Sequence, residues 1–308
     1  MSRAAVLIRT HYLDEPLLDL AGRLRRDGMF DVFILADETH GALDTGDLPK
    51  VSLTVAATSG LGLYHAAPNL LWRCGDYGLY VARQALPRYD AFWMVEPDVR
   101  LNAARPSDIL ARFPGPDAID LLAARLGPAA ADWDWALTLD AAEGPIIRCL
   151  FALVRLSVRA IDVLLEARRQ ASLAHLELGR DPALWSNDEV FVASTLARRG
   201  LACRDLNDFG QIYQEVGFSF WLPLTEREIE AGGREGWIYH PVLSGQRYFI
   251  KLCRLAMRHG VLDELEPVVE RLTGVEWTPE EAKGHRRAIE LLKAQQVQAA
   301  VAVEATKT

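Results

Sequence analysis

The sequence has few cysteines, and they form no pattern. The four residues, Cys74, Cys149, Cys203 and Cys253, are widely separated along the 308-residue chain, and no Cys-x-x-Cys pair occurs. This spacing predicts neither a zinc ribbon nor a disulfide framework. We expect free thiols in a reducing compartment.

Basic residues are fewer than acidic residues. The chain has 34 Lys and Arg residues against 42 Asp and Glu residues, which gives a formal net charge of −8. A surface that neutralises nucleic-acid phosphates needs a basic stripe, and the sequence contains no long one. We therefore expect no nucleic-acid partner.

Long apolar runs are missing as well. The stretch near the start, Ala4 to Ile8, is too short for a signal-peptide core or a membrane span. We expect a cytoplasmic protein without a membrane span, in which any contact with the cytoplasmic face of a membrane is peripheral. Half of the residues are hydrophobic, which is enough for one large globular domain with an appendage.

The clearest positive signal is an apolar strand followed by two acids. Five apolar residues run from Ala91 to Val95, the pattern of a strand covered on both faces of a parallel sheet. Pro97 cannot donate to a sheet, so the strand should end near Glu96, and Glu96 and Asp98 should point the same way. Two oxygen ligands at such an edge suit a divalent cation that holds a diphosphate. The alternative is a solvated acidic loop.

The first part of the chain reads as a β-α-β unit. Ala4 to Ile8 is a buried strand, and a helix with Asp14 as its N-cap then continues until Gly28. A second apolar strand is predicted for Asp31 to Ala36, with Asp37 at its C-terminal end. Consecutive strands joined by a helix predict a parallel pair with a right-handed crossover.

Several later apolar runs predict further strands. They alternate with helical patterns, as expected for an α/β fold. The runs cover residues 51–55, 119–124, 146–154, 201–206 and 237–242.

Two predicted helix starts carry charged residues. Arg73 precedes a helix whose cap we expect to be Asp76, and an arginine there is well placed for phosphate oxygens. A Trp-Arg pair next to a helix start more often reflects packing and surface charge. Farther on, Ser186 and Glu189 have the spacing of a capping box. A capping box would explain Glu189 but not Asp188, which we expect in the first turn of the helix, facing outward. The helix dipole alone would also favour an acid at this position.

The last part of the chain contains one candidate metal ligand, and its sequence pattern then changes from strands to helices. His240 stands before a proline at the end of a short apolar strand, and a lone histidine there is more often a core residue than a ligand. From residue 246 the sequence turns into amphipathic helices, followed by a small-residue tail. These helices could form an oligomer surface.

Taken in order, these pieces resemble the A-type glycosyltransferase (GT-A) fold. The resemblance covers about residues 4–245, and Glu96-Pro97-Asp98 stands in the place of the metal-binding D-x-D motif, as E-x-D. It implies an α/β fold class: a single nucleotide-binding catalytic domain, residues 1–245, with a mostly parallel mixed sheet. Residues 246–308 would form a C-terminal helical region with a flexible tail.

The resemblance also implies roles for individual residues. Asp98 would be the firmest metal ligand, and Asp188 or Glu189 would act as catalytic base. The full set comprises the metal ligands Glu96, Asp98 and His240, the catalytic residues Asp188 and Glu189, and the nucleotide contacts Thr10, Asp37, Arg73 and Asp76.

The implied activity is transfer of a sugar from a nucleotide-sugar donor to a saccharide or lipid-linked acceptor, such as a cell-surface polysaccharide, with Mn²⁺ or Mg²⁺ and inversion at the anomeric carbon. A nucleotidyltransferase acting on a sugar phosphate would need a glycine-rich loop after the first strand, and residues 9–13 contain no glycine. A non-catalytic carbohydrate-binding or scaffold protein of the same fold is the other alternative.

Overall fold

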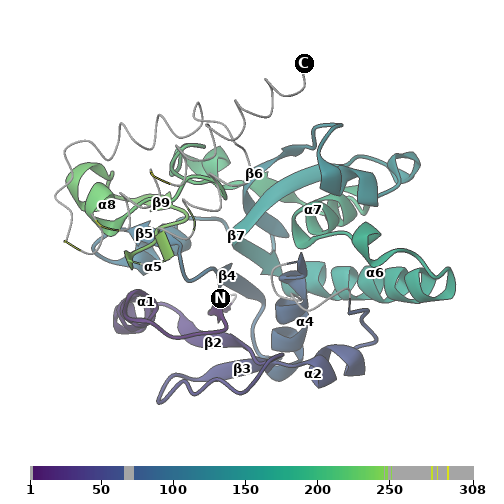
Figure 1. Ribbon diagram of the computed structural model, residues 1–308, viewed down its shortest axis with the longest axis horizontal. Helices are drawn as coiled ribbons and strands as arrows, with labels where there is room; N and C mark the ends of the chain where they lie inside the picture. Colours follow the sequence, from purple (N-terminus) through teal and green to yellow (C-terminus); the bar gives the residue numbers. More distant parts are fainter. Residues whose placement is uncertain are drawn as a thin grey trace. The chain divides into compact units, whose positions relative to one another are not determined.

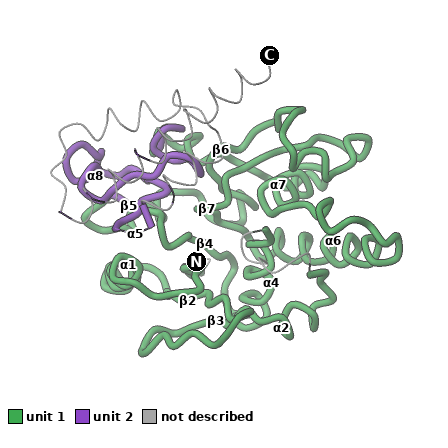
Figure 2. The backbone as a smooth tube through the Cα atoms, viewed as in Figure 1, with its two compact units in different colours: residues 1–99, 103–212 green, residues 100–102, 213–308 purple. Residues whose placement is uncertain are grey.

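The computed structural model describes residues 3–65 and 73–245, with residues 247, 248, 251, 279, 283 and 290. These residues belong to two compact units (Figure 2). Unit 1 comprises residues 1–99 and 103–212, and unit 2 comprises residues 100–102 and 213–308. The helices that we predicted within residues 246–308 fall outside the described ranges.

Within the described residues, unit 1 is built on a seven-stranded mixed sheet with the order β3-β2-β1-β4-β7-β6-β8 (Figure 1). Strand β7 is antiparallel to both of its neighbours, β4 and β6, and the other pairs are parallel. The predicted α/β class with a mostly parallel mixed sheet is confirmed. The strands are β1 (Ala4–Thr10), β2 (Asp31–Asp37), β3 (Lys50–Leu53), β4 (Ala91–Val95), β6 (Leu121–Pro128), β7 (Ile147–Ser157) and β8 (Cys203–Asp205).

The predicted β-α-β unit is present. Helix α1 (Glu15–Asp27) is capped by Asp14, whose side chain accepts a hydrogen bond from the Leu17 N–H at 3.1 Å. The helix ends at Gly28, which has a φ of 70° that glycine adopts without strain. Strands β1 and β2 on either side of the helix pair in parallel.

Helices cover both faces of the sheet. A hydrophobic cluster that includes Ala5 and Leu7 of β1 and Phe92 and Met94 of β4 packs against α4, α6 and α7. Helices α1 and α5 pack against each other and bury separate apolar residues, so they belong to the opposite face. The other helices in the described part of unit 1 are α2 (Val55–Gly60), α4 (Asp76–Ala85), α5 (Pro106–Ala111), α6 (Val158–Glu177) and α7 (Asp188–Arg198), with short 3₁₀ helices at Asp134–Thr138, Ala141–Glu143, Pro182–Leu184 and Leu206–Phe209.

Two predicted helix caps were wrong by one residue. Helix α4 begins at Asp76 with Gly75 as its N-cap, so Asp76 does not cap it. Helix α7 is capped by Asn187, whose side chain accepts from the Val190 N–H, and the predicted box between Ser186 and Glu189 does not form. The Ser186 hydroxyl is bound to Thr138 instead, at 2.8 Å.

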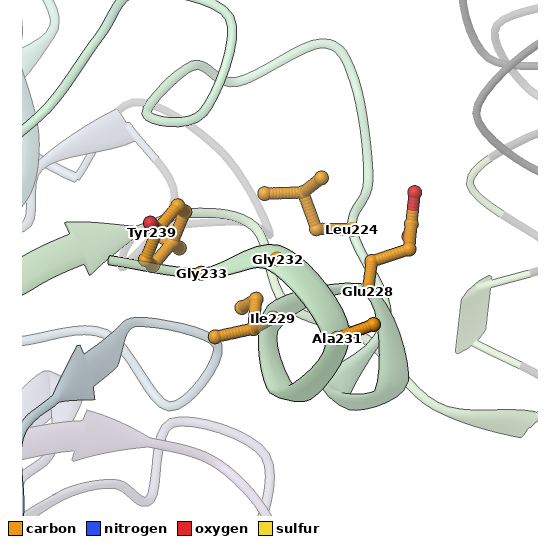
Figure 3. A pocket seen from close by; sticks show the side chains of 7 residues that line it. All are labelled: Leu224, Glu228, Ile229, Ala231, Gly232, Gly233 and Tyr239. Atoms are coloured by element: carbon orange, nitrogen blue, oxygen red, sulfur yellow. The ribbon is translucent and has the colours of Figure 1, made fainter. Parts of the chain in front are cut away.

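Unit 2 contains a small antiparallel sheet of β5 (Arg100–Asn102) and β9 (Trp237–Tyr239), and the helix α8 (Glu226–Gly232). A hollow of about 330 Å³ opens beside α8 (Figure 3). Its walls are mainly apolar and include Leu224, Ile229 and the ring of Tyr239. The one acid in its lining, Glu228, is held by the Thr225 N–H in the capping box of α8.

In the part of the chain that the structure describes, every helix is too short or too polar to cross a membrane.

Candidate functional site

The candidate site lies at the carboxyl ends of the central strands of unit 1. The chain leaves β1 for β2 and β3 on one side, then returns to add β4 on the other side of β1. The strand order therefore reverses between β1 and β4, which in open α/β sheets creates the crevice where ligands bind. Because these strands are parallel, their carboxyl ends share one edge of the sheet. Thr10 and Asp37 are the last residues of β1 and β2, and Glu96 directly follows β4.

Two predicted nucleotide contacts organise the turns at this edge. The Thr10 hydroxyl donates to the Tyr12 carbonyl at 2.6 Å and accepts from the Tyr12 N–H. One carboxylate oxygen of Asp37 accepts from both the N–H and the hydroxyl of Thr39, at 3.0 and 2.6 Å. Both side chains are thus held at the ends of their strands, with Asp37 partly exposed.

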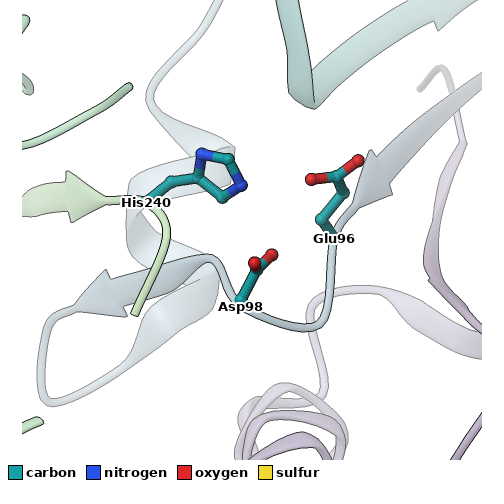
Figure 4. A group of neighbouring side chains, drawn as sticks. All are labelled: Glu96, Asp98 and His240. Atoms are coloured by element: carbon teal, nitrogen blue, oxygen red, sulfur yellow. The ribbon is translucent and has the colours of Figure 1, made fainter. Parts of the chain in front are cut away.

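The acidic turn follows β4 directly. The Glu96 N–H still donates to the Ala152 carbonyl of β7 at 2.8 Å, and the turn closes when the Val99 N–H donates to the Glu96 carbonyl at 3.1 Å. Figure 4 shows Glu96 at the end of the strand and Asp98 on the turn that follows it. Both carboxylates are partly exposed, so they are within reach of a ligand from solvent.

Arg9 is the central cation of the site, and no pattern in the sequence predicted this role. Its position continues the alternation of Ala5 and Leu7, so it points to the α4–α7 face of the sheet, as Glu96 does after Met94. The guanidinium binds Glu96 through Nη2, and Nη1 lies 3.5 Å from Oδ2 of Asp188. Burial opposes the charge on Arg9, but Glu96 and Asp188 outweigh burial, and the pKa of Arg9 is raised.

Asp188 is buried, and the expectation that it faces outward was wrong. With Asn187 as the cap, Asp188 becomes the first residue of α7 and turns inward, where it is 3% exposed. Its Oδ1 accepts from the Glu189 N–H at 2.8 Å, and its Oδ2 accepts from the Gly75 N–H at 2.9 Å. Burial raises the pKa of Asp188 well above its ordinary value, against the lowering effect of Arg9.

Gly75 gives the Arg9 guanidinium its space. A Cβ at this position would lie 1.6 Å from Nη1 of Arg9 and 2.5 Å from Oδ2 of Asp188. Since real Cβ atoms do not approach other atoms so closely, only glycine allows the backbone at the start of α4 to contact both groups. The glycine before a helix was visible in the sequence, but its two contacts come from distant strands and helices.

Asp76 and Arg73 lie beside this cluster and have partners of their own. Asp76 is fully buried and binds Arg168 and the Tyr80 hydroxyl. Arg73 donates through Nε to the Trp185 carbonyl at 3.0 Å and through Nη2 to the Ala183 carbonyl at 2.6 Å. The guanidinium that faces Glu96 is therefore that of Arg9, not that of Arg73.

Glu189 is partly exposed, in contrast to Asp188. Its carboxylate accepts a hydrogen bond from the Asn187 side-chain amide at 3.3 Å. The two acids at the start of α7 therefore have different surroundings. One is buried beside a cation, and the other is accessible to solvent.

His240 belongs to unit 2, where it follows β9 and is 5% exposed. Its Nδ1 lies 2.7 Å from the Ser219 carbonyl oxygen, which can only accept, so Nδ1 carries the proton. In the neutral ring, Nε2 then holds the lone pair that a metal ion would need. The arrangement is that of a metal-binding histidine, and it is equally that of a satisfied core histidine.

Comparison with known proteins adds little to this geometry. The chain matches no protein-family model and no curated protein sequence. Among solved structures, it is similar to a glycosyltransferase involved in the glycosylation of the major capsid of PBCV-1, with 10% sequence identity and a TM-score of 0.38. The match covers 83% of this chain and 99% of that chain. This similarity is too low to support an argument about function.

Proposed function

We propose that this protein transfers a sugar from a nucleoside-diphosphate sugar to a saccharide or lipid-linked acceptor, with the help of a divalent cation. The observation that carries the proposal is the position of Glu96-Pro97-Asp98. This acidic turn directly follows β4, beside β1, where the strand order of the sheet reverses. An open α/β sheet binds nucleotides at that point, and carboxylates there suit a metal–diphosphate pair.

The donor set fits Mn²⁺ or Mg²⁺. Asp98 and Glu96 offer hard carboxylate oxygens, and we assign His240 as a third ligand through Nε2. When bound, the cation would neutralise the charge that grows on the departing nucleoside diphosphate.

The neighbouring strand ends supply the remaining donor contacts in this proposal. Thr10 and Asp37 would meet the nucleoside base and ribose from the ends of β1 and β2. Asp76, with its charge satisfied by Arg168, is not assigned to the nucleotide, and Arg73 would need to leave two carbonyl partners to bind a phosphate.

Glu189 is our candidate for the catalytic base. It is partly exposed at the first turn of α7, whereas Asp188 is buried against Arg9. A carboxylate that takes the proton of the acceptor hydroxyl activates it for direct attack, and direct attack inverts the anomeric carbon. Asp188 would then hold Arg9 in place rather than contact the acceptor.

One observation favours a non-catalytic binding protein instead. The Arg9 guanidinium gives both Glu96 and Asp188 a complete structural role as its counter-ions. In such a protein the acidic turn would stabilise the fold and bind no metal.

Calorimetry with UDP, GDP and CDP, with and without Mn²⁺, tests the proposal. We expect Mn²⁺-dependent binding of at least one of them to the wild type, and a loss of tenfold or more in affinity in Asp98→Ala and His240→Ala. Asp162→Ala removes an exposed acid that pairs with Arg83 and should bind as the wild type does. If no diphosphate binds, or if Asp98→Ala binds as tightly as the wild type, the proposal is wrong. Hydrolysis of a nucleotide-sugar that Glu96→Ala abolishes would exclude the non-catalytic alternative.

A further inference from the structure

The guanidinium of Arg9 is enclosed by residues from three other parts of the chain. Arg9 comes from β1, Glu96 follows β4, Asp188 begins α7, and Gly75 precedes α4. The Arg9 side chain is 9% exposed and that of Asp188 is 4% exposed, whereas the Glu96 side chain retains 22% exposure. The cation is therefore buried, and one of its two anionic partners reaches solvent.

This position is built for a guanidinium. Gly75 leaves bare backbone against Nη1, where any Cβ would overlap it, and the Gly75 N–H fixes the Asp188 carboxylate from the other side. An arginine keeps its charge at every pH that a folded protein meets, so this positive charge is permanent. The guanidinium contacts the Glu96 carboxylate, and Asp98 is two residues after Glu96 in the chain.

A divalent cation and Arg9 would therefore compete for the same carboxylate. The Glu96 oxygen that Arg9 binds already has a strong charge-assisted partner, and the guanidinium also repels a second cation nearby. A nucleoside diphosphate brings negative charge of its own, which offsets the repulsion. Metal and nucleotide would then bind better together than either does alone.

We propose that Arg9 is a positioning residue that holds Glu96 and weakens the binding of a free divalent cation to the acidic turn, so that the cation enters mainly as a complex with a nucleoside diphosphate. The inference rests on the metal site of the proposed function. It concerns the affinity of the turn for the metal alone, and so it can be tested without any reaction.

The test is Mn²⁺ binding to the full-length protein, measured from the electron paramagnetic resonance signal of free Mn²⁺, with and without UDP. In Arg9→Met, we expect the dissociation constant for Mn²⁺ alone to fall about tenfold, because a positive charge next to the turn is gone. The factor by which UDP improves Mn²⁺ affinity should shrink. A merely structural role predicts the opposite sign, since damage to the fold weakens metal binding.

Two further variants keep the result decisive. Arg9→Met with Asp188→Asn removes Arg9 together with its buried partner, so the one carboxylate left without the cation is that of Glu96, which reaches solvent. This variant should also bind Mn²⁺ more tightly than the wild type. Arg83→Met removes a cation that pairs with Asp162 elsewhere and should leave Mn²⁺ affinity unchanged.

Unchanged or weaker Mn²⁺ binding in the folded Arg9 variants overturns the inference. Tighter Mn²⁺ binding in these variants, with no binding of UDP, GDP or CDP to any form of the protein, would support the role of Arg9 and would reject the proposed transfer reaction.

Discussion

The guanidinium of Arg168 donates to both carboxylate oxygens of Asp76, from Nε to Oδ2 at 2.8 Å and from Nη2 to Oδ1 at 3.2 Å. Both side chains are buried, and the Tyr80 hydroxyl adds a third hydrogen bond to Asp76 at 2.7 Å. The cation also lies over the ring of Phe191, 3.7 Å from its centre. Asp76 therefore joins α4 to α6 inside the core.

Asp76→Ala should destabilise the protein by about 3–5 kcal/mol, because it leaves the Arg168 charge buried without its partner. Urea denaturation of the variant and the wild type measures this difference. Asp162→Ala, which breaks the exposed pair with Arg83, is the matched control and should cost less than about 1 kcal/mol. A small effect of Asp76→Ala on stability, together with a large loss of nucleotide affinity, would instead show that Asp76 contacts the nucleotide.

Gly75→Ala should displace the Arg9 guanidinium, since the new Cβ would overlap Nη1. We expect a loss of about 2 kcal/mol or more in stability, the range for forcing extra atoms into a packed site. Gly60→Ala is the matched control, because nothing lies within 4 Å of a Cβ there and Gly60 is in a helix. Equal melting curves for Gly75→Ala and Gly60→Ala would show that the space around Arg9 is not tightly packed.

Glu189→Gln should lower the rate of sugar transfer by about 10²–10⁴ with donor affinity retained, because a positioned base contributes that much and an amide cannot accept the proton. Glu177→Gln changes an exposed glutamate at the end of α6 and should leave the rate unchanged. The measurement is single-turnover transfer with saturating donor. If Glu189→Gln retains the wild-type rate and a folded Asp188→Asn protein does not, the base is Asp188.

Glu38 should make stability depend on pH in the acid range. Hydrogen bonds from Lys50, Ser52 and the Leu43 N–H lower its pKa from 4.5 to about 2. A carboxylate with a lowered pKa stabilises the fold above its unfolded pKa, and this contribution is lost as the pH falls toward the folded value. The wild type should therefore be more stable than Glu38→Gln at pH 6, with the difference shrinking between pH 4.5 and 2. A difference that is constant across a pH series of urea denaturations would contradict the role of Glu38.

Local patterns in the sequence predicted the elements that depend on local chemistry. The unbroken apolar run from Ala91 to Val95 became β4 with the predicted bounds, and Asp14 caps the helix that its position indicated. At α7 the prediction shifted by one residue because Ser186 and Asn187 are both good caps. The Ser186 hydroxyl is bound to Thr138, so Asn187 caps the helix. Thr138 is 48 residues away in the chain, so a local pattern does not reveal this contact.

The electrostatics of the site could not be predicted in this way. Arg9 stands 87 residues from Glu96, and Gly75 stands 113 residues from Asp188. A charged residue at the end of an apolar strand usually faces solvent, and nothing near Arg9 in the sequence indicates that two carboxylates will surround it. Only the strand order of the sheet brings these residues together.

The order of the strands also matters while the protein is being synthesised. Strand β1 lies between β2 and β4 in the finished sheet. Strand β4 consists of residues 91–95, so it is synthesised long after β1 and β2. Until then, an apolar strand with one unpaired edge remains open to any other strand in the cell, which is the arrangement that promotes aggregation. A truncated chain that ends before Ala91 should therefore depend on chaperones for its solubility, because β1 gains its second neighbour only when β4 has been made.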